Sequence, residues 1–159
     1  MTAKKLWSPS TTKNTLSLFL EYIADKGNFT SYSDLHKWSI KYKEIFWDKF
    51  WSFTDIQGDK KDDIFIDSKH FIETKFFNSS KLNYTENCLQ KDTNDEAIIF
   101  YNEQKYSKRI SWKQLRSNVF KISHYFKSQN INQNDRIAAV LPNMPETVEA
   151  FLALSLIHI

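Results

Sequence analysis

The sequence predicts an α/β protein in which a helical, aromatic-rich N-terminal region leads into the start of an α/β domain. Two patterns carry this prediction. Apolar residues recur at helical spacing over roughly the first third of the chain, and from Asp95 onward short apolar runs alternate with helical patterns. With 159 residues, of which 41% are hydrophobic and 16% aromatic, the chain has enough apolar material for a sizeable core.

The first helix is expected over residues 12–26. Thr11 or Thr12 is available as its N-cap, and Gly27 is able to stop it. The apolar residues that define the helix fall on one face at helical spacing: Leu16, Phe19, Leu20 and Ile23.

Two further helices are expected before residue 54. Ser31 and Asp34 have the pattern of a capping box, in which each side chain bonds the backbone N–H of the other residue, and they predict a short helix. The next helix covers residues 43–53 and carries a broad aromatic face that we expect to lie in the core. Its members are Phe46, Trp47, Phe50 and Trp51.

The middle of the chain is less regular. Residues 57–63 are charged and are expected to form a surface loop, and residues 64–66 have the pattern of a short strand. Residues 70–89 mix loop with a short helix. The runs 97–101 and 108–110 flank a polar turn without Gly or Pro, which predicts a β-hairpin with a looser loop.

The last part of the chain predicts a helix, a strand and a second helix. Ser111 and Gln114 form a capping-box pattern at the start of the first. Its apolar residues recur at three- and four-residue steps: Trp112, Leu115, Val119, Ile122 and Phe126. Residues 136–141 have the pattern of a strand buried on both faces, and Pro145 opens the second helix. Strands alternating with helices predict the beginning of a parallel sheet.

Composition narrows the class of protein. The net charge is +3, and 19 of the 22 basic residues are Lys, whereas nucleic-acid readers rely on Arg, so we expect no nucleic-acid partner. One cysteine excludes an internal disulfide and indicates a reducing compartment. No apolar run follows Lys4 and Lys5, and no apolar stretch has the length that a membrane span needs, so we expect no secretory signal and a cytoplasmic protein without a membrane partner.

No catalytic, cofactor-binding or metal-binding residue emerges from the residues alone. The chain holds two glycines, too few for a familiar phosphate-binding loop. Four histidines lack metal-ligand spacing and are expected to be surface or packing residues: His36, His70, His124 and His158. Cys88 is more simply a packing residue than a nucleophile. Asp59, Asp62 and Asp63 have two interpretations, a loose cation site or a solvated turn. Residues 41–53 also have two, an RNA-binding segment or an ordinary amphipathic helix.

Several stretches, taken in order, resemble one family. They are Leu6-Trp7-Ser8-Pro9, Tyr32-x-x-Leu35-His36-x-Trp38-Ser39, Phe46-Trp47, Phe76-Phe77-x-x-x-Lys81-Leu82-Asn83-Tyr84-x-Glu86-Asn87, Asp95-Glu96-Ala97-Ile98-Ile99, Ser111-Trp112-x-x-Leu115 and Asp135-Arg136-Ile137-Ala138-x-x-Leu141-Pro142-Asn143-x-Pro145-Glu146. This order is similar to the N-terminal portion of the acetoacetyl-CoA synthetases, which are acyl-CoA ligases of the adenylate-forming superfamily. Single pieces such as Leu-Pro-Asn-x-Pro-Glu are shared across that superfamily, whereas their order over residues 6–153 is specific.

The resemblance implies an ATP-dependent acid–thiol ligase of lipid and fatty acid metabolism. In such enzymes the carboxylate of acetoacetate, or a similar short acid, attacks the α-phosphate of Mg-ATP, and the thiol of CoA then displaces AMP. The full-length enzyme would use ATP, Mg²⁺ and CoA. The family's catalytic parts lie further along the chain, so we expect this segment to be inactive and to bind none of these cofactors.

The resemblance also divides the chain. Residues 1–93 correspond to the helical N-terminal extension, and residues 94–153 to the beginning of the AMP-binding α/β domain. Residues 154–159 depart from the family pattern, and the codons of a common transposase sequencing adapter would spell the same six residues. We therefore expect a truncated gene product with a non-native tail.

Two other interpretations stay open at the level of sequence. Acetyl- and propionyl-CoA synthetases resemble the chain at Leu82-Asn83 and at Asn87-Cys88-Leu89, but there the second stretch tends to continue into an Asp-Arg-His that is absent here. A short non-enzymatic module, which binds RNA or regulates a full-length synthetase by docking on it, is the alternative from another class.

Overall fold

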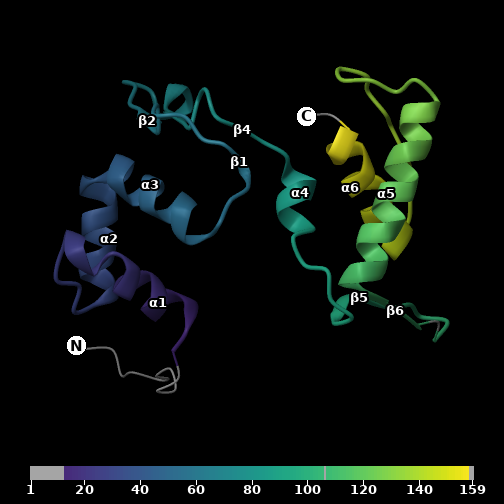
Figure 1. Ribbon diagram of the computed structural model, residues 1–159, viewed down its shortest axis with the longest axis horizontal. Coiled ribbons are helices and arrows are strands. Elements are labelled where there is room, and N and C mark those ends of the chain that lie inside the picture. Colours follow the sequence, from purple (N-terminus) through teal and green to yellow (C-terminus); the bar gives the residue numbers. More distant parts are fainter. Residues whose placement is uncertain (1–12, 106, 158–159) are drawn as a thin grey trace. The chain divides into compact units, whose positions relative to one another are not determined.

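The computed structural model describes residues 13–105 and 107–157, which form two compact units (Figure 1). The first unit comprises residues 13–56 and 61–78, and the second comprises residues 57–60 and 79–157. The chain is thus mixed helix and strand, as the sequence predicts. The domain boundary expected after residue 93 refers to the longer family members and stays a prediction.

The first unit is mainly helical. Its elements are α1 (Thr15–Tyr22), the 3₁₀ turn η1 (Ala24–Lys26), α2 (Tyr32–Lys41), α3 (Lys43–Phe53), β2 (Phe65–Ile66), the 3₁₀ turn η2 (Phe71–Glu73) and β3 (Lys75–Phe76). β2 and β3 pair antiparallel, so the short strand expected at residues 64–66 is present. The helices expected at residues 43–53 and after Ser31 are confirmed.

Two N-caps explain where the first helices begin. Asn14 caps α1 in a reciprocal capping box with Ser17, and the expected caps, Thr11 and Thr12, lie outside the described residues. The predicted start at residue 12 was therefore wrong, because Asn14, which the sequence analysis did not consider, is the residue that caps the helix. Ser31 caps α2 in the capping box with Asp34 that the sequence predicts.

Aromatic packing builds the core of the first unit. Phe19 lies at its centre, with the rings of Phe46, Phe50 and Phe53 at centroid distances of 5.9, 5.9 and 5.0 Å. Such edge-on contacts add to the free energy gained from burial alone. Trp51 is also buried, so the aromatic face of α3 faces the core as predicted.

The second unit packs two long helices against a hairpin. Its elements are β1 (Gly58–Asp59), β4 (Lys81–Leu82), α4 (Tyr84–Cys88), β5 (Glu96–Tyr101), β6 (Ser107–Ser111), α5 (Trp112–Ser128) and α6 (Pro145–Ile157). β5 and β6 form the predicted hairpin. Ser111 caps α5 by accepting a hydrogen bond from Gln114 N, so half of the predicted capping box is confirmed, whereas the reciprocal bond to the Gln114 side chain is not formed among the described residues. The core between these elements contains Leu89, Ile110, Leu115, Val119, Leu152 and Ala153.

The structure corrects two sequence predictions in this unit. Gly58 and Asp59 are not simply loop, because they pair antiparallel with Lys81–Leu82. Residues 136–141 are not a buried strand, because they form no element and their side chains are exposed. A strand buried on both faces needs neighbouring strands, and none of the sheets that the described residues form includes this segment.

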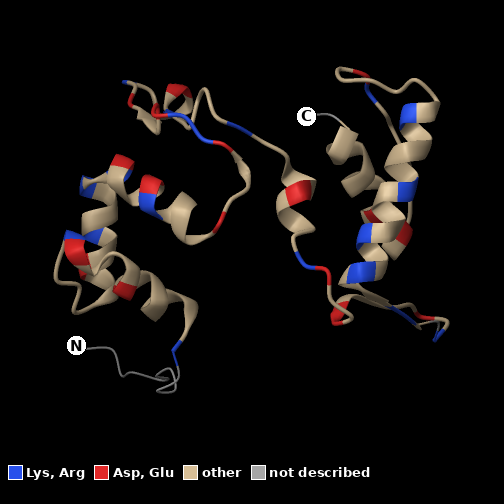
Figure 2. Cartoon of the chain, viewed as in Figure 1, with Lys and Arg blue, Asp and Glu red and all other residues tan. Residues whose placement is uncertain are grey.

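Charged residues of both signs are spread over the chain, but several helices carry charges of one sign alone (Figure 2). α5 carries four basic residues and no Asp or Glu over its 17 residues. The described helices are also too short or too polar for any of them to span a lipid bilayer.

Candidate functional site

The histidines do not form a site. His36 lies exposed on α2, stacked on Tyr32 with a centroid distance of 6.1 Å, and His70 is exposed just before η2. His124 is exposed on α5, and His158 lies outside the described residues. Nowhere within residues 13–105 and 107–157 do three His, Cys, Asp or Glu residues meet in a way that could hold a metal ion.

Cys88 is a packing residue at the end of α4. It is half-buried against the core of the second unit, and a hydrogen bond with it raises the pKa of the Tyr84 hydroxyl. None of the three described histidines joins this pair, so the described residues do not form the arrangement of a thiol beside a base that nucleophilic catalysis requires.

The acidic stretch near Gly58 is likewise no cation site. Asp59 belongs to β1, whereas Asp62 and Asp63 follow outside the strand, and no metal-holding group is found among the described residues. The two glycines offer no phosphate cradle either, because Gly58 lies in β1 and Gly27 has extended backbone with φ at 166°. These aspartates and glycines therefore provide neither a metal site nor a phosphate loop for ATP–Mg²⁺ chemistry.

The residues that carry the family resemblance instead join separate segments. Asn83 caps α4 by accepting a hydrogen bond from Glu86 N at 3.1 Å, and its amide donates to the carbonyl of Ser155 in α6 at 2.9 Å. Thr85 is fully buried and its hydroxyl donates to the carbonyl of Leu152 at 2.8 Å. The Leu-Asn-Tyr-Thr-Glu-Asn stretch thus fixes α4 to the C-terminal half of α6.

Asn87 forms the second connection between segments that are distant in sequence. Its side-chain oxygen accepts from Gln57 N at 2.8 Å, and its side-chain amide donates to the Gln57 carbonyl at 2.9 Å. An amide side chain that satisfies both backbone groups of one residue acts like a neighbouring strand. It holds the entry to β1 against α4, next to the β1–β4 pairing.

The hydrogen bonds that Asn83 and Thr85 donate to α6 do not depend on its side chains. The helix is continuous through residues 154–157, and Asn83 bonds backbone carbonyls there, which any helical sequence offers. The origin of the six terminal residues, given from the sequence as a non-native tail, stays a prediction.

A buried polar pair between α5 and α6 escaped the sequence analysis. Glu149 is 5% exposed, and its carboxylate accepts a hydrogen bond from Asn118 at 2.8 Å. The signal was present in the sequence, since both residues lie within apolar helical patterns, but spacing alone could not show that they face each other.

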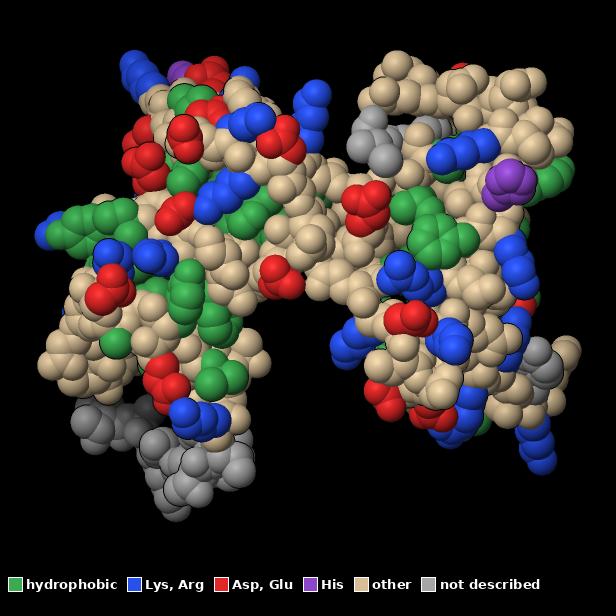
Figure 3. All heavy atoms as spheres, in the orientation of Figure 1, with side chains coloured by type: hydrophobic (Ala, Val, Ile, Leu, Met, Phe, Trp, Pro, Cys, Tyr) green, Lys and Arg blue, Asp and Glu red, His purple; other side chains and the backbone are tan. Residues whose placement is uncertain are grey.

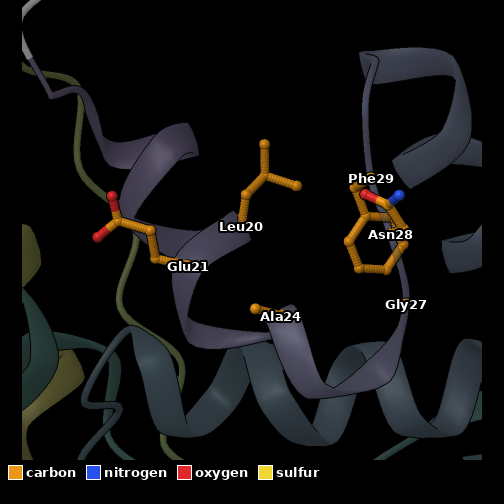
Figure 4. Close-up of a pocket in the computed structure, with 6 residues that line it drawn as sticks. All are labelled: Leu20, Glu21, Ala24, Gly27, Asn28 and Phe29. Atoms are coloured by element: carbon orange, nitrogen blue, oxygen red, sulfur yellow. The ribbon is translucent and has the colours of Figure 1, made fainter.

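The first unit contains an open hollow of about 500 Å³ beside the end of α1 (Figure 4). Leu20, Ala24 and Phe29 line it together with Gly27, Asn28 and Glu21. Its carboxylate, Glu21, forms an exposed ion pair with Lys13 at 3.0 Å. The polar side chains of this hollow are one exposed, ion-paired carboxylate and the amide of Asn28, which together give it no evident chemistry.

Comparison with known proteins shows which proteins this chain resembles. The family model described as AMP-binding enzyme matches residues 85–158. The acetoacetyl-coenzyme A synthetase of Rhizobium meliloti is 30% identical over 155 residues, which cover 94% of this chain and 24% of the relative. The malonamoyl-CoA synthetase of Penicillium aethiopicum is 29% identical over 93% of this chain and 22% of its own length.

The fold agrees. The solved structure of acetoacetyl-CoA synthetase from Streptomyces lividans matches with a TM-score of 0.86 and 22% identity, over 98% of this chain and 26% of that one. The chain thus spans about a quarter of the length of the relatives it matches. The resemblance indicated by the sequence motifs is therefore confirmed: over nearly its whole length, the chain is similar to the N-terminal quarter of acetoacetyl-CoA synthetases.

Proposed function

We propose that these residues are the N-terminal part of an ATP-dependent acetoacetate–CoA ligase, which forms acetoacetyl-CoA, AMP and pyrophosphate from acetoacetate, ATP and CoA. The observation that carries the proposal is the match to acetoacetyl-CoA synthetases along nearly the whole chain, including the helical N-terminal part that precedes the AMP-binding match.

In this proposal the described residues serve as a scaffold. The core of the second unit, formed by the hairpin with α5 and α6, would be the start of the AMP-binding domain, and the bonds of Asn83 and Thr85 would hold α4 on it. ATP, Mg²⁺ and CoA would be bound by other parts of the enzyme. We also propose a cytoplasmic location, which the single cysteine supports, and a role in lipid and fatty acid metabolism.

The acid is the least determined part of the proposal. The two named substrates among the relatives, acetoacetate and malonamate, are both short acids with a carbonyl group on the third carbon. We therefore propose a short acid of this kind as the substrate, with acetoacetate first.

The test is acyl-CoA formation by the purified full-length gene product with a panel of acids. Acetoacetate and malonamate carry the carbonyl on the third carbon, and acetate and propionate lack it. We expect the highest kcat/KM with acetoacetate. A clear preference for acetate or propionate would move the protein to the acetyl- or propionyl-CoA synthetases, and no thioester with any acid would contradict the ligase proposal.

A further inference from the structure

A second hollow lies on the exposed face of α5, beside the segment that follows α4. It has a volume of about 400 Å³ and is lined by Asp92, Lys113, Arg116, Ser117, Phe120 and Lys121. We call it the α5 groove. Its volume falls in the range typical of sites for small molecules.

The groove is basic because of the composition of α5. Lys113, Arg116 and Lys121 lie on a helix without acidic residues, and within residues 13–105 and 107–157 none of them forms an ion pair. The one carboxylate in the groove, Asp92, leaves a net positive charge. Figure 3 shows Lys and Arg side chains beside hydrophobic ones over α5.

The groove residues form two stripes along the helix. Lys113, Ser117 and Lys121 are spaced four residues apart, so they lie on one line about 12 Å long, at about 1.5 Å per residue. Cations and a hydroxyl in this order can bind successive phosphate groups. The carboxylate of Asp92 would disfavour a long polyanion such as RNA.

The other stripe consists of two flat groups, the guanidinium of Arg116 and the ring of Phe120. The guanidinium of Arg116 lies 5.4 Å from the ring centroid of Phe120, and Phe120 is 45% exposed. Arg116 is fixed in place because it also donates to the carbonyl of Leu89 at 2.8 Å. An ordered guanidinium and a half-exposed ring form a platform on which a nucleobase can stack.

We propose that the α5 groove binds a nucleoside polyphosphate, with the base on Arg116 and Phe120 and the phosphates along Lys113, Ser117 and Lys121. The inference does not depend on the ligase proposal, because it rests on side chains that those arguments do not use. It goes against the expectation from the sequence that this segment binds no cofactor. The spacing of residues along the sequence did not reveal that the fold places the ring of Phe120 beside the cations of the groove.

The experiment is calorimetric titration of the chain with ADP, and with adenosine and inorganic pyrophosphate as its two halves. We expect ADP to bind at least about tenfold more tightly than either half, since charge-assisted bonds and stacking both contribute. Replacing both lysines, Lys113→Gln with Lys121→Gln, should weaken ADP binding about tenfold or more. Phe120→Leu should weaken ADP binding about fivefold and leave pyrophosphate binding unchanged.

Lys127→Gln is the matched control, because Lys127 lies on α5 outside the groove and should leave ADP binding unchanged. Arg116 is left intact, since its bond to Leu89 has a structural role. Amide spectra of each variant check that the fold is kept. No ADP binding at millimolar concentration, equal binding of ADP and pyrophosphate, or unchanged binding in the double-lysine variant would each overturn the proposal.

Discussion

The residues that carry the family resemblance connect segments that are distant in sequence. Asn83, Thr85 and Asn87 each bond a backbone group in a segment distant in sequence, with donor–acceptor distances of 2.8 to 2.9 Å. Buried polar groups with satisfied partners specify one arrangement, because removing either partner leaves a costly unpaired group. A motif can therefore mark a family without taking part in its chemistry.

Asn87 gives the sharpest test of this role. In Asn87→Ala both hydrogen bonds to Gln57 are lost, and we expect a destabilisation of about 1–3 kcal/mol. The amide of Gln57 should also lose its protection from hydrogen exchange. Urea unfolding and exchange measured by NMR check both effects, with the exposed Asn28→Ala as control. An unchanged exchange rate at Gln57 would contradict the role of Asn87 in holding the backbone of Gln57.

The ion pair between Lys108 and Glu146 predicts a small pH dependence. The hydrogen bond from Lys108 lowers the pKa of Glu146, and the two side chains are 30% and 47% exposed, so solvent screens the pair. A carboxyl with a lowered pKa in the folded state contributes stability above its usual pKa of about 4.3, and that stability is lost as the pH falls through the folded value.

Lys108→Gln should therefore lower stability by less than about 1 kcal/mol at pH 7, and the difference from the unmodified chain should shrink below about pH 4. Unfolding by urea at several pH values measures this. Lys127→Gln, on an exposed face of α5, serves as the control. A difference that grows as the pH falls would contradict the assignment.

At the scale of elements, local signals in the sequence were sufficient where structure is local. The capping box at Ser31, the N-cap at Ser111 and the aromatic face of α3 all appear as predicted, because helix ends and helix faces depend on neighbours within a few residues. The strands β1 and β4 escaped prediction, since two residues carry no period and their pairing spans more than 20 positions of sequence.

The segment 136–141 shows the other limit. Its composition fits a strand buried on both faces, yet Ile137, Val140 and Leu141 are exposed in the structure. Sequence reports what a segment is suited for, whereas a strand forms only where a partner is present. An exposed apolar segment of this kind favours association between chains.

This difference can be measured. Val140→Lys should change the free energy of unfolding by less than about 0.5 kcal/mol and should reduce aggregation, because the side chain is exposed. Ile110→Ala should cost about 2–5 kcal/mol, since Ile110 is fully buried in the core of the second unit. Urea unfolding and light scattering distinguish the two. Equal destabilisation would show that Val140 is buried in solution.

At the scale of the whole molecule, the chain consists of two compact units that together match about a quarter of an acetoacetyl-CoA synthetase. Each unit has its own core, one aromatic and one aliphatic. The functional residues proposed for the ligase were not predictable from this segment, because catalysis also needs metal-binding groups, and the described residues bring no such group together. In the proposed ligase this segment would contribute the frame.

The most direct test of this account is ATP–pyrophosphate exchange with acetoacetate and Mg²⁺, measured for residues 1–159 and for the proposed full-length synthetase in parallel. The account predicts acetoacetate-dependent exchange by the full-length protein and none above a mock preparation by residues 1–159. Exchange by residues 1–159 would contradict the scaffold role, and its absence from the full-length protein would contradict the proposed ligase.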